Sequence, residues 1–196
     1  MEMISVLMAS YNYQVYMEEA IKSILGQTWK NFELFIIDDG SKDNSIELAH
    51  SLAKQDSRIH VLQHYDGKNH GLPETLLRGL NEAQGEWIAF LESDDFWEPT
   101  CLEQRMKVVQ QTGADVVFNA IRPFPMPGAD TGWFNTYVPR VMREHAHRSL
   151  QAEGAYSLQT SLLVENKIPT FSCAMLRAEC LRKCSFTAPV PRWLDW

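Results

Sequence analysis

Two largely apolar runs lie near the start of the chain, MISVLMA at residues 3–9 and FELFIID at residues 32–38. Runs of this length without regular alternation are typical of strands that are covered on both faces. Between them, apolar residues recur at helical spacing and Gly26 ends the pattern. The apolar stripe consists of Met17, Ala20, Ile21, Ile24 and Leu25. The pattern predicts a strand, a helix and a second, parallel strand joined by a right-handed crossover.

The alternation of helix and strand patterns continues along the chain. Turn and capping residues at Ser41, Asp43 and Asn44 precede the next helical pattern. In chain order, the expected elements are helix 46–55, strand 58–64, helix 73–84, strand 86–92, helix 102–113 and strand 114–120. Strands that alternate with helices indicate an α/β fold with an open, mostly parallel sheet flanked by helices.

The pattern becomes irregular after residue 120. The segment 121–133 is rich in proline and glycine, which predicts a long loop or hairpin over the rim of the sheet. Residues 137–152 carry a basic patch, for which a solvated helix face is the alternative to a binding role. Its members are Arg140, Arg143, His145, His147 and Arg148. Residues 170–184 predict a strand that passes into a short helix.

Composition narrows the class of protein. The 196 residues carry a formal net charge of −7, which argues against a nucleic-acid binder because such a protein needs a basic face. The length favours one globular domain. No window reaches the apolar length of a membrane span, so membrane contact would be peripheral or supplied by sequence outside this chain. The four cysteines lack metal-ligand spacing and no signal peptide follows Met1, which indicates reduced thiols in a cytoplasmic protein.

Three carboxylates, Glu92, Asp94 and Asp95, stand together in the stretch FLESDDFWEP. Anions this close repel one another and raise each other's pKa values unless a cation lies between them. Hard divalent ions such as Mg²⁺ take oxygen ligands and often bind through one or two carboxylates plus the phosphates of a substrate. From these residues alone, the alternative is a solvated acidic turn that caps the helix after Pro99.

Polar residues follow three of the predicted strands. Tyr11 and Asn12 come after the first strand, Asp38 and Asp39 after the second, and the carboxylates of 92–95 after the fourth. In open α/β sheets, ligands bind in the crevice beyond the carboxyl ends of the strands. Three polar clusters from separate parts of the sequence therefore converge on one rim, which an isolated acidic turn does not explain.

Four stretches occur in a fixed order along the chain: ISVLMASYN, LFIIDDGSKDNS, GEWIAFLESDDFWEP and WLDW. Together they resemble the family 2 glycosyltransferases over nearly the whole chain, most tightly over residues 3–105. The resemblance implies a GT-A fold, which is a Rossmann-like α/β arrangement. It divides one domain into a donor-binding subdomain at 1–121 and a smaller acceptor-side subdomain at 122–196.

The resemblance also implies where the nucleotide sugar binds. The loop after the first strand would hold the base and ribose. Asp39 would accept a hydrogen bond from the imide N–H that uracil has and cytosine lacks, which favours a UDP-sugar. Asp38 would orient the turn through backbone N–H groups. The expected donor-binding residues are Ala9, Ser10, Tyr11, Asn12, Asp39, Lys68, Arg78, Glu92, Ser93 and Asp94.

The stretch ESDD resembles the family's metal motif, commonly written DxDD. By that match Asp94 ligates Mg²⁺ or Mn²⁺, Asp95 supports the metal, and Glu92 faces the sugar and ribose. The glutamate replaces the usual first aspartate, which puts a direct role of Glu92 in question. A second departure is Leu77, where family members commonly carry an asparagine. That contact could pass to Arg78, Lys68 or Asn69, and Gly71 suits a close backbone approach.

The stretch WLDW resembles the family's "ED" motif, which implies that Asp195 is the catalytic base. A displacement at the anomeric carbon needs a group that takes the proton of the attacking acceptor hydroxyl. Without the resemblance, Asp195 would be read as a helix cap. Family members continue beyond this point, so the resemblance predicts that the chain is a fragment of a longer protein.

The expected function is therefore an inverting glycosyltransferase that moves a sugar from a nucleotide diphosphate, with UDP favoured, to a hydroxyl of a glycan or lipid-linked acceptor. Bacterial surface polysaccharide or cell-wall assembly is the setting by analogy, in the cytoplasm, with peripheral association at the inner face of the membrane left open. The first alternative is a catalytically incompetent donor-binding fragment. The second is a nucleotidyltransferase, which expects a glycine-rich phosphate loop after the first strand that SYNYQVYMEE lacks.

Overall fold

The computed structural model describes residues 2–122, 124, 132 and 170–183 of the chain. Within these ranges, strands and helices alternate as the apolar pattern predicts. The elements are β1 (Ile4–Ser10), α1 (Gln14–Leu25), β2 (Phe32–Asp38), α2 (Ser45–Ala53), β3 (Ile59–Gln63), α3 (Leu72–Glu82), β4 (Trp87–Phe90), α4 (Cys101–Thr112), β5 (Val116–Phe118), the 3₁₀ helix η1 (Phe171–Cys173), β6 (Ala174–Arg177) and α7 (Ala178–Lys183).

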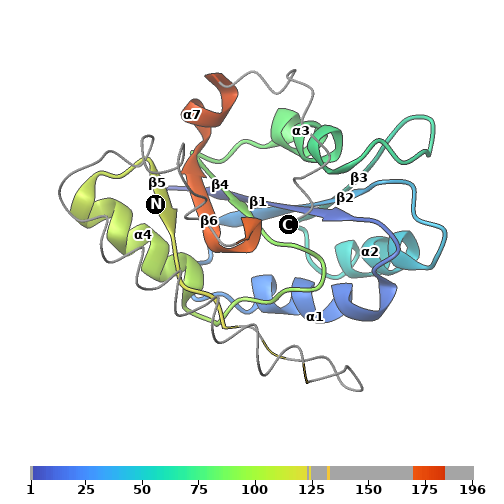
Figure 1. Cartoon of the computed structure of the whole chain (residues 1–196), viewed down its shortest axis with the longest axis horizontal. Coiled ribbons are helices and arrows are strands. Elements are labelled where there is room, and N and C mark those ends of the chain that lie inside the picture. Colours follow the sequence, from blue (N-terminus) through green and yellow to red (C-terminus); the bar gives the residue numbers. More distant parts are fainter. Residues whose placement is uncertain (1, 123, 125–131, 133–169, 184–196) are drawn as a thin grey trace.

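The described strands form one six-stranded sheet in the order β3-β2-β1-β4-β6-β5 (Figure 1). Strands β1 to β4 are mutually parallel, whereas β6 runs antiparallel to both β4 and β5. The strand that the sequence predicts in 170–184 is therefore present, and it separates β4 from β5. The sheet order puts the parallel strands of the βαβ units on one side and β6 and β5 on the other.

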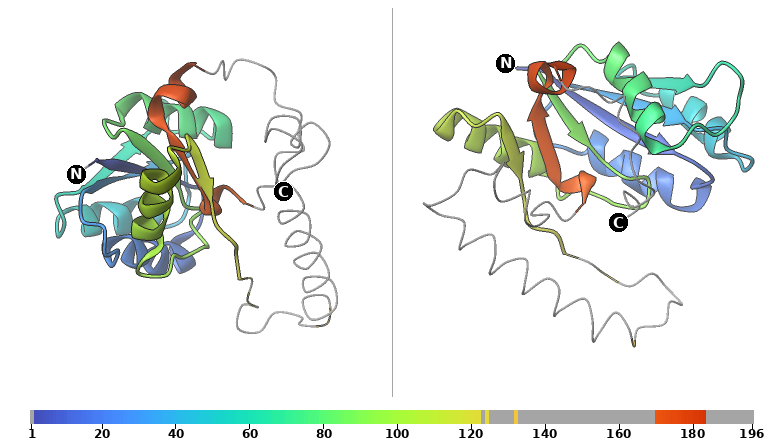
Figure 2. Two further views of the ribbon diagram at one scale, coloured as in Figure 1. Left: turned by 90° about the vertical axis from the view of Figure 1, so that its left-hand side faces the viewer. Right: turned by 45° about the horizontal axis from the view of Figure 1, so that its top comes forward.

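Helices cover both faces of the sheet. Figure 1 shows α3 and α7 on one face and α1, α2 and α4 on the other, and the second view in Figure 2 shows the same layers. Side chains of β1 alternate between the two layers: Ile4, Val6 and Met8 pack with α1, and Leu7 packs with α3. Coverage on both faces explains why β1 reads as a continuous apolar run.

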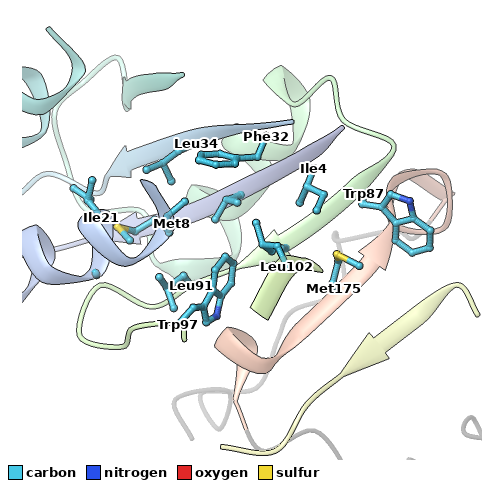
Figure 3. Close-up of a cluster of buried hydrophobic side chains, with 14 of the residues drawn as sticks. Ile4, Met8, Ile21, Phe32, Leu34, Trp87, Leu91, Trp97, Leu102 and Met175 are labelled. Atoms are coloured by element: carbon cyan, nitrogen blue, oxygen red, sulfur yellow. The ribbon is translucent and has the colours of Figure 1, made fainter. Parts of the chain in front are cut away.

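The larger buried cluster joins the strands to α1 and α4. Figure 3 shows Met8 and Ile21 from opposite layers of this cluster, together with Trp87 at the other end. On the opposite face, α3 approaches the sheet closely at Gly79, where a Cβ atom would lie 2.8 Å from Ile37 Cδ1. A side chain at this position would therefore push α3 away from β2.

Several expectations are confirmed and others lie outside the described residues. Helix α1 begins at Gln14, slightly before the predicted apolar stripe. Leu77 of α3 is partly buried and packs against the hydrophobic core. Most of the loop 121–133, the basic patch in 137–152 and Asp195 fall outside the described ranges. Within those ranges, no helix is long and apolar enough to cross a bilayer.

Candidate functional site

The carboxyl ends of the parallel strands meet at one rim, as the sequence predicts. Ser10 at the end of β1 lies opposite Asp38 at the end of β2, and Asp38 lies opposite Gln63 at the end of β3. Phe90 at the end of β4 pairs with Leu7 of β1. The loops that follow these strands therefore begin side by side.

The loops after β1 and β2 are interlocked. Asn12 has a left-handed backbone, with φ of 60°, and its side-chain Oδ1 accepts a 2.7 Å hydrogen bond from the N–H of Lys42. The N–H of Asn12 donates to the hydroxyl of Ser41, and the N–H of Tyr13 donates to the hydroxyl of Ser45. Tyr11 remains 44% exposed, so its ring is available to a ligand. Asn12 therefore shapes the loop that presents Tyr11.

Asp38 is buried and holds the turn after β2. Its Oδ2 accepts hydrogen bonds of 3.2 Å from the N–H groups of Gly40 and Ser41, which matches the structural role expected from the sequence. Its Oδ1 is buried without a protein partner, and so is the hydroxyl oxygen of Ser10. Ser10 is only 3% exposed, so a contact with a ligand would be made by its backbone.

Asp39 ties the loop after β2 to the loop after β3. Its Oδ1 accepts a 2.7 Å hydrogen bond from the N–H of His70, and its Oδ2 accepts a 3.0 Å bond from the N–H of Gly71. The ring of His64 lies 3.4 Å from the same carboxylate and stacks on His70, with ring centroids 4.2 Å apart. Each carboxylate oxygen can accept a second hydrogen bond, so these contacts leave acceptor capacity for a base.

The two loops also touch through their backbones. Gly40 has φ of +79°, and a Cβ atom there would lie 2.7 Å from the carbonyl carbon of Lys68. Around Gly71, the nearest protein atom to such a Cβ is Pro73 Cδ, at 4.0 Å. The Lys68 side chain is exposed, beside Asp66.

Arg78 lies on α3, on the side of the rim formed by β3. Its guanidinium stacks on the ring of Tyr65 at 4.7 Å, and its Nε is buried without a protein partner. Tyr65 itself is 97% exposed. The structure therefore places Arg78 and Lys68 beside the β3 loop, apart from the carboxylate cluster after β4.

The carboxylate cluster occupies the loop after β4. Asp94 is exposed, while Glu92 and Asp95 are half-buried. The hydroxyl of Thr170 donates a 2.8 Å hydrogen bond to Glu92 Oε2, and the N–H of Glu92 donates to the hydroxyl of Ser172 at 2.9 Å. Two residues from the far end of the described chain thus contact the motif.

Burial and mutual repulsion set the charge state of this cluster. Burial raises the pKa of Glu92, and repulsion from Asp95 and Asp94 adds to that shift. Burial also raises the pKa of Asp95, with a further contribution from Asp94. The charge of Asp94 is the main reason that the pKa of the Tyr13 hydroxyl is raised. Burial is therefore the main cause of the raised pKa values of Glu92 and Asp95, and the charges of the neighbouring carboxylates add to it.

Ser93 has a structural contact within the same loop. It is 4% exposed, and its hydroxyl donates a 2.6 Å hydrogen bond to the carbonyl of Ala9. The bond fixes the loop after β4 against the end of β1. Ala9 and Ser93, both expected to bind the donor, therefore lie together at the centre of the rim.

The carboxylate oxygens of this cluster suit a hard divalent ion whose coordination is completed by a ligand. Among the described residues, no three His, Cys, Asp or Glu side chains form a complete metal site. Mg²⁺ and similar ions usually bind through one or two carboxylates, with phosphates and water completing the shell. The exposed Asp94 beside the half-buried Asp95 meets that requirement.

Asp94 and Asp95 line one end of a cavity of about 820 Å³. It continues between α4 and the segment after β5, on the side of the sheet away from β3. Its lining includes half-exposed aromatic rings, among them Phe96 and Phe124, whose centroids are 5.1 Å apart. The cavity therefore lies beside β5 and opens next to the carboxylates of the rim.

Three residues of the site escaped sequence reasoning: Tyr13, Thr170 and Ser172. The charge of Asp94 raises the pKa of the Tyr13 hydroxyl, and the place of Tyr13 directly after Asn12 was the available signal. Thr170 and Ser172 lie about 80 residues from Glu92 in sequence, so no local pattern connects them to it.

The chain resembles known proteins in sequence. A family model described as glycosyl transferase family 2 matches residues 5–184. The Streptococcus pneumoniae glycosyltransferase GlyG is 39% identical over 116 residues, which is 59% of this chain and 38% of GlyG. Two Bacillus subtilis relatives are named as glycosyltransferases. EpsH is 36% identical over 75% of this chain and 42% of its own length. The teichuronic acid biosynthesis protein TuaG is 35% identical over 56% of this chain and 42% of its own length. The chain thus spans about two fifths of these relatives.

Solved structures share the fold. Staphylococcus aureus TarS 1–349 matches 93% of this chain and 48% of TarS, with a TM-score of 0.66 at 22% identity. The same protein in complex with UDP-GlcNAc matches 65% of this chain and 37% of its own chain, with a TM-score of 0.56 at 23% identity. The Pyrobaculum calidifontis mannosyltransferase PcManGT, in complex with GDP-Man and Mn²⁺, matches 61% of this chain and 36% of PcManGT. Its TM-score is 0.57 at 20% identity. With the fold, the rim and the family model in agreement, the chain belongs to glycosyl transferase family 2 and has the GT-A fold.

Proposed function

We propose that this chain is the donor-binding and catalytic part of a metal-dependent, inverting glycosyltransferase. It would move a sugar from a UDP-sugar to a hydroxyl of a glycan or lipid-linked acceptor. The observation that carries the proposal is the exposed Asp94 at the carboxyl rim, flanked by the half-buried acids Glu92 and Asp95. Such a cluster is expected where a cation and a diphosphate bind together.

Each part of a nucleotide sugar would have its own place along the rim. The base and ribose would lie over the loops after β1 and β2, with the exposed ring of Tyr11 against the base. Asp39 would accept the uracil N–H through lone pairs that its bonds to His70 and Gly71 do not use. The TarS structure with UDP-GlcNAc supports a uridine donor, and PcManGT, in complex with GDP-Man, makes GDP the nucleotide to compare with UDP.

The diphosphate would lie beside Asp94. Asp94 and Asp95 would hold Mg²⁺ or Mn²⁺, which, when bound, offsets the carboxylate charge and stabilises the departing nucleoside diphosphate. Thr170 and Ser172 hold Glu92 in place beside them. The cavity of about 820 Å³ next to Asp94 has room for the acceptor on the side away from the β3 loop.

The proposed base is Asp195, by its resemblance to the acidic motif of the family. Its carboxylate would take the proton of the acceptor hydroxyl as that oxygen attacks the anomeric carbon from the face opposite the diphosphate. A single displacement inverts the configuration. The alternative is a fragment that binds the donor without catalysis, since the chain spans 38% of GlyG and 42% of EpsH.

Turnover of UDP-sugars separates these two proposals. UDP release would be measured for the chain and for Asp195→Asn, with Mn²⁺ and with a chelator. A catalytic chain shows metal-dependent turnover that falls by about a hundredfold or more in Asp195→Asn, because a positioned base contributes about 10² to 10⁴ in rate. Equal background turnover in both, with UDP binding retained, would leave only the donor-binding alternative.

A further inference from the structure

Arg105 is a buried arginine at the base of the candidate site. It lies on α4 with 2% of its surface exposed. Its Nε donates a 2.8 Å hydrogen bond to Asn119 Oδ1, and its Nη2 donates a 2.8 Å bond to the carbonyl of Ser172. Within the described part of the chain, no carboxylate pairs with it. Burial lowers its pKa.

A buried charge without a counterion is costly, so its partners deserve a physical explanation. Isolated charges lose several kcal/mol of hydration, about the stability of a small domain, unless hydrogen bonds replace the water. Arg105 recovers this cost through Asn119, through the carbonyls of Ser172 and Ala174, and by stacking on Trp97 at 4.7 Å. Two of these contacts are with carbonyls of η1 and the start of β6, and the other two partners, Asn119 and Trp97, themselves donate hydrogen bonds to carbonyls of η1.

Ser172 connects this network to the carboxylate loop. Its carbonyl accepts from both Arg105 and the indole N–H of Trp97, the latter at 2.7 Å. Its hydroxyl accepts the N–H of Glu92 at 2.9 Å, and the N–H of Asp95 donates to the carbonyl of Glu92 at 3.1 Å. Figure 3 shows Trp97 beside Leu91 in the core directly beneath this loop. Arg105 thus binds the carbonyl of Ser172, and the hydroxyl of Ser172 binds the loop that carries the carboxylates.

Thr170 completes the connection. Its hydroxyl accepts the N–H of Ser172 at 2.9 Å and donates its proton to Glu92 Oε2 at 2.8 Å. A hydroxyl has one proton to donate, and here that proton points at the carboxylate. The orientation of Glu92 therefore depends on where η1 lies, and Arg105 fixes η1.

We propose that Arg105 is a positioning residue: through Ser172 and Thr170, it holds Glu92, and with Glu92 the loop that carries Asp94 and Asp95, in the geometry that the metal–diphosphate site needs. The inference rests on the proposed function for its consequence in binding, but the restraint of the loop is a property of this chain alone. Groups that orient metal ligands from behind commonly alter metal affinity or activity by about 10- to 100-fold when they are replaced.

Hydrogen–deuterium exchange of the full chain tests the restraint without any ligand. In Arg105→Lys, peptides covering residues 90–98 and 170–177 exchange at least about tenfold faster, because the amide of Glu92 loses its fixed acceptor on Ser172. Arg58→Lys is the matched control, since Arg58 also stacks on a ring, Phe32 at 4.3 Å, but lies before β3 at the opposite rim. It should leave both peptides unchanged. Unchanged exchange in Arg105→Lys would overturn the proposal.

The second arm measures the Mn²⁺ concentration needed for half-maximal UDP binding. Arg105→Lys and the milder Thr170→Val should each raise it by about tenfold or more, and Arg58→Lys should not. Faster exchange with an unchanged Mn²⁺ requirement would overturn the positioning role. If Arg105→Lys does not fold, Thr170→Val decides by the same two readouts. If the unaltered chain binds no UDP, the proposed function fails, and the exchange data still decide whether Arg105 restrains the loop.

Discussion

The main-chain N–H of His70 donates a 2.7 Å hydrogen bond to Oδ1 of Asp39, a residue 31 positions earlier in the chain. The next N–H, of Gly71, donates to the other oxygen of the same carboxylate. Asp39 is 4% exposed, so these bonds form out of water. One carboxylate therefore shapes the loop on which α3 begins, beside the proposed place of the base.

Replacement of Asp39 by asparagine should destabilise the fold. One backbone N–H would face an amide N–H₂ in place of an acceptor, which costs about 1–3 kcal/mol when the group is buried. Urea unfolding measures the loss. Asp38→Asn is the matched control, because Oδ1 of Asp38 has no protein partner and can be replaced by the amide nitrogen with both existing bonds kept. Equal losses in the two variants would contradict this account of Asp39.

The close approach of two loops at Gly40 predicts a second stability difference. Gly67→Ala should cost about 1 kcal/mol, because its φ of +62° is strained for alanine although the space around it is open. Gly40→Ala has the same backbone problem and would also place Cβ 2.7 Å from the backbone of Lys68. Overpacking adds about 1–3 kcal/mol. Thermal or urea unfolding compares the two variants, and equal costs would show that the loops separate freely.

The folding stability should depend on pH through His70. Hydrogen bonds to Asp66 and then to Glu74, each 2.9 Å from a ring nitrogen, raise the pKa of His70 above its ordinary value of 6.5. A raised folded pKa means that protonated His70 stabilises the fold below pH 6.5, and that this contribution is lost as pH rises through the folded pKa.

The measurement is the difference in unfolding free energy between the chain and His70→Gln, taken by urea titration at pH 6 and at pH 8.5. The chain should exceed the variant at pH 6, and the gap should narrow at pH 8.5. His64 and Asp39 remain in both proteins, but the stacking of His64 on His70 is lost in the variant, so the readout is the change of the gap with pH and not its size. A gap that stays constant or widens with pH would show that the ion pairs of His70 do not contribute.

The apolar pattern predicted the order of the elements and the rim because these depend on local periodicity. The role of Asp38 in orienting the turn after β2 could also be predicted, since the hydrogen bonds of Asp38 reach only two and three residues ahead. The pairing of β6 between β4 and β5 could not be predicted, because a four-residue strand has too short a pattern to name its neighbours. The contacts of Ser172 and Arg105 depend on that pairing, so they were missed with it.

The central claim is that Asp94 binds a divalent cation together with a uridine diphosphate. Calorimetric titration with UDP and with GDP, each with and without Mn²⁺, tests it on the chain, on Asp94→Ala and on a control, Asp115→Ala. Asp115 precedes β5 and pairs with Arg177, so it lies at the opposite rim. The account predicts UDP binding that requires Mn²⁺, that is lost in Asp94→Ala and that persists in Asp115→Ala. Binding that is indifferent to Mn²⁺ or to Asp94 would contradict it.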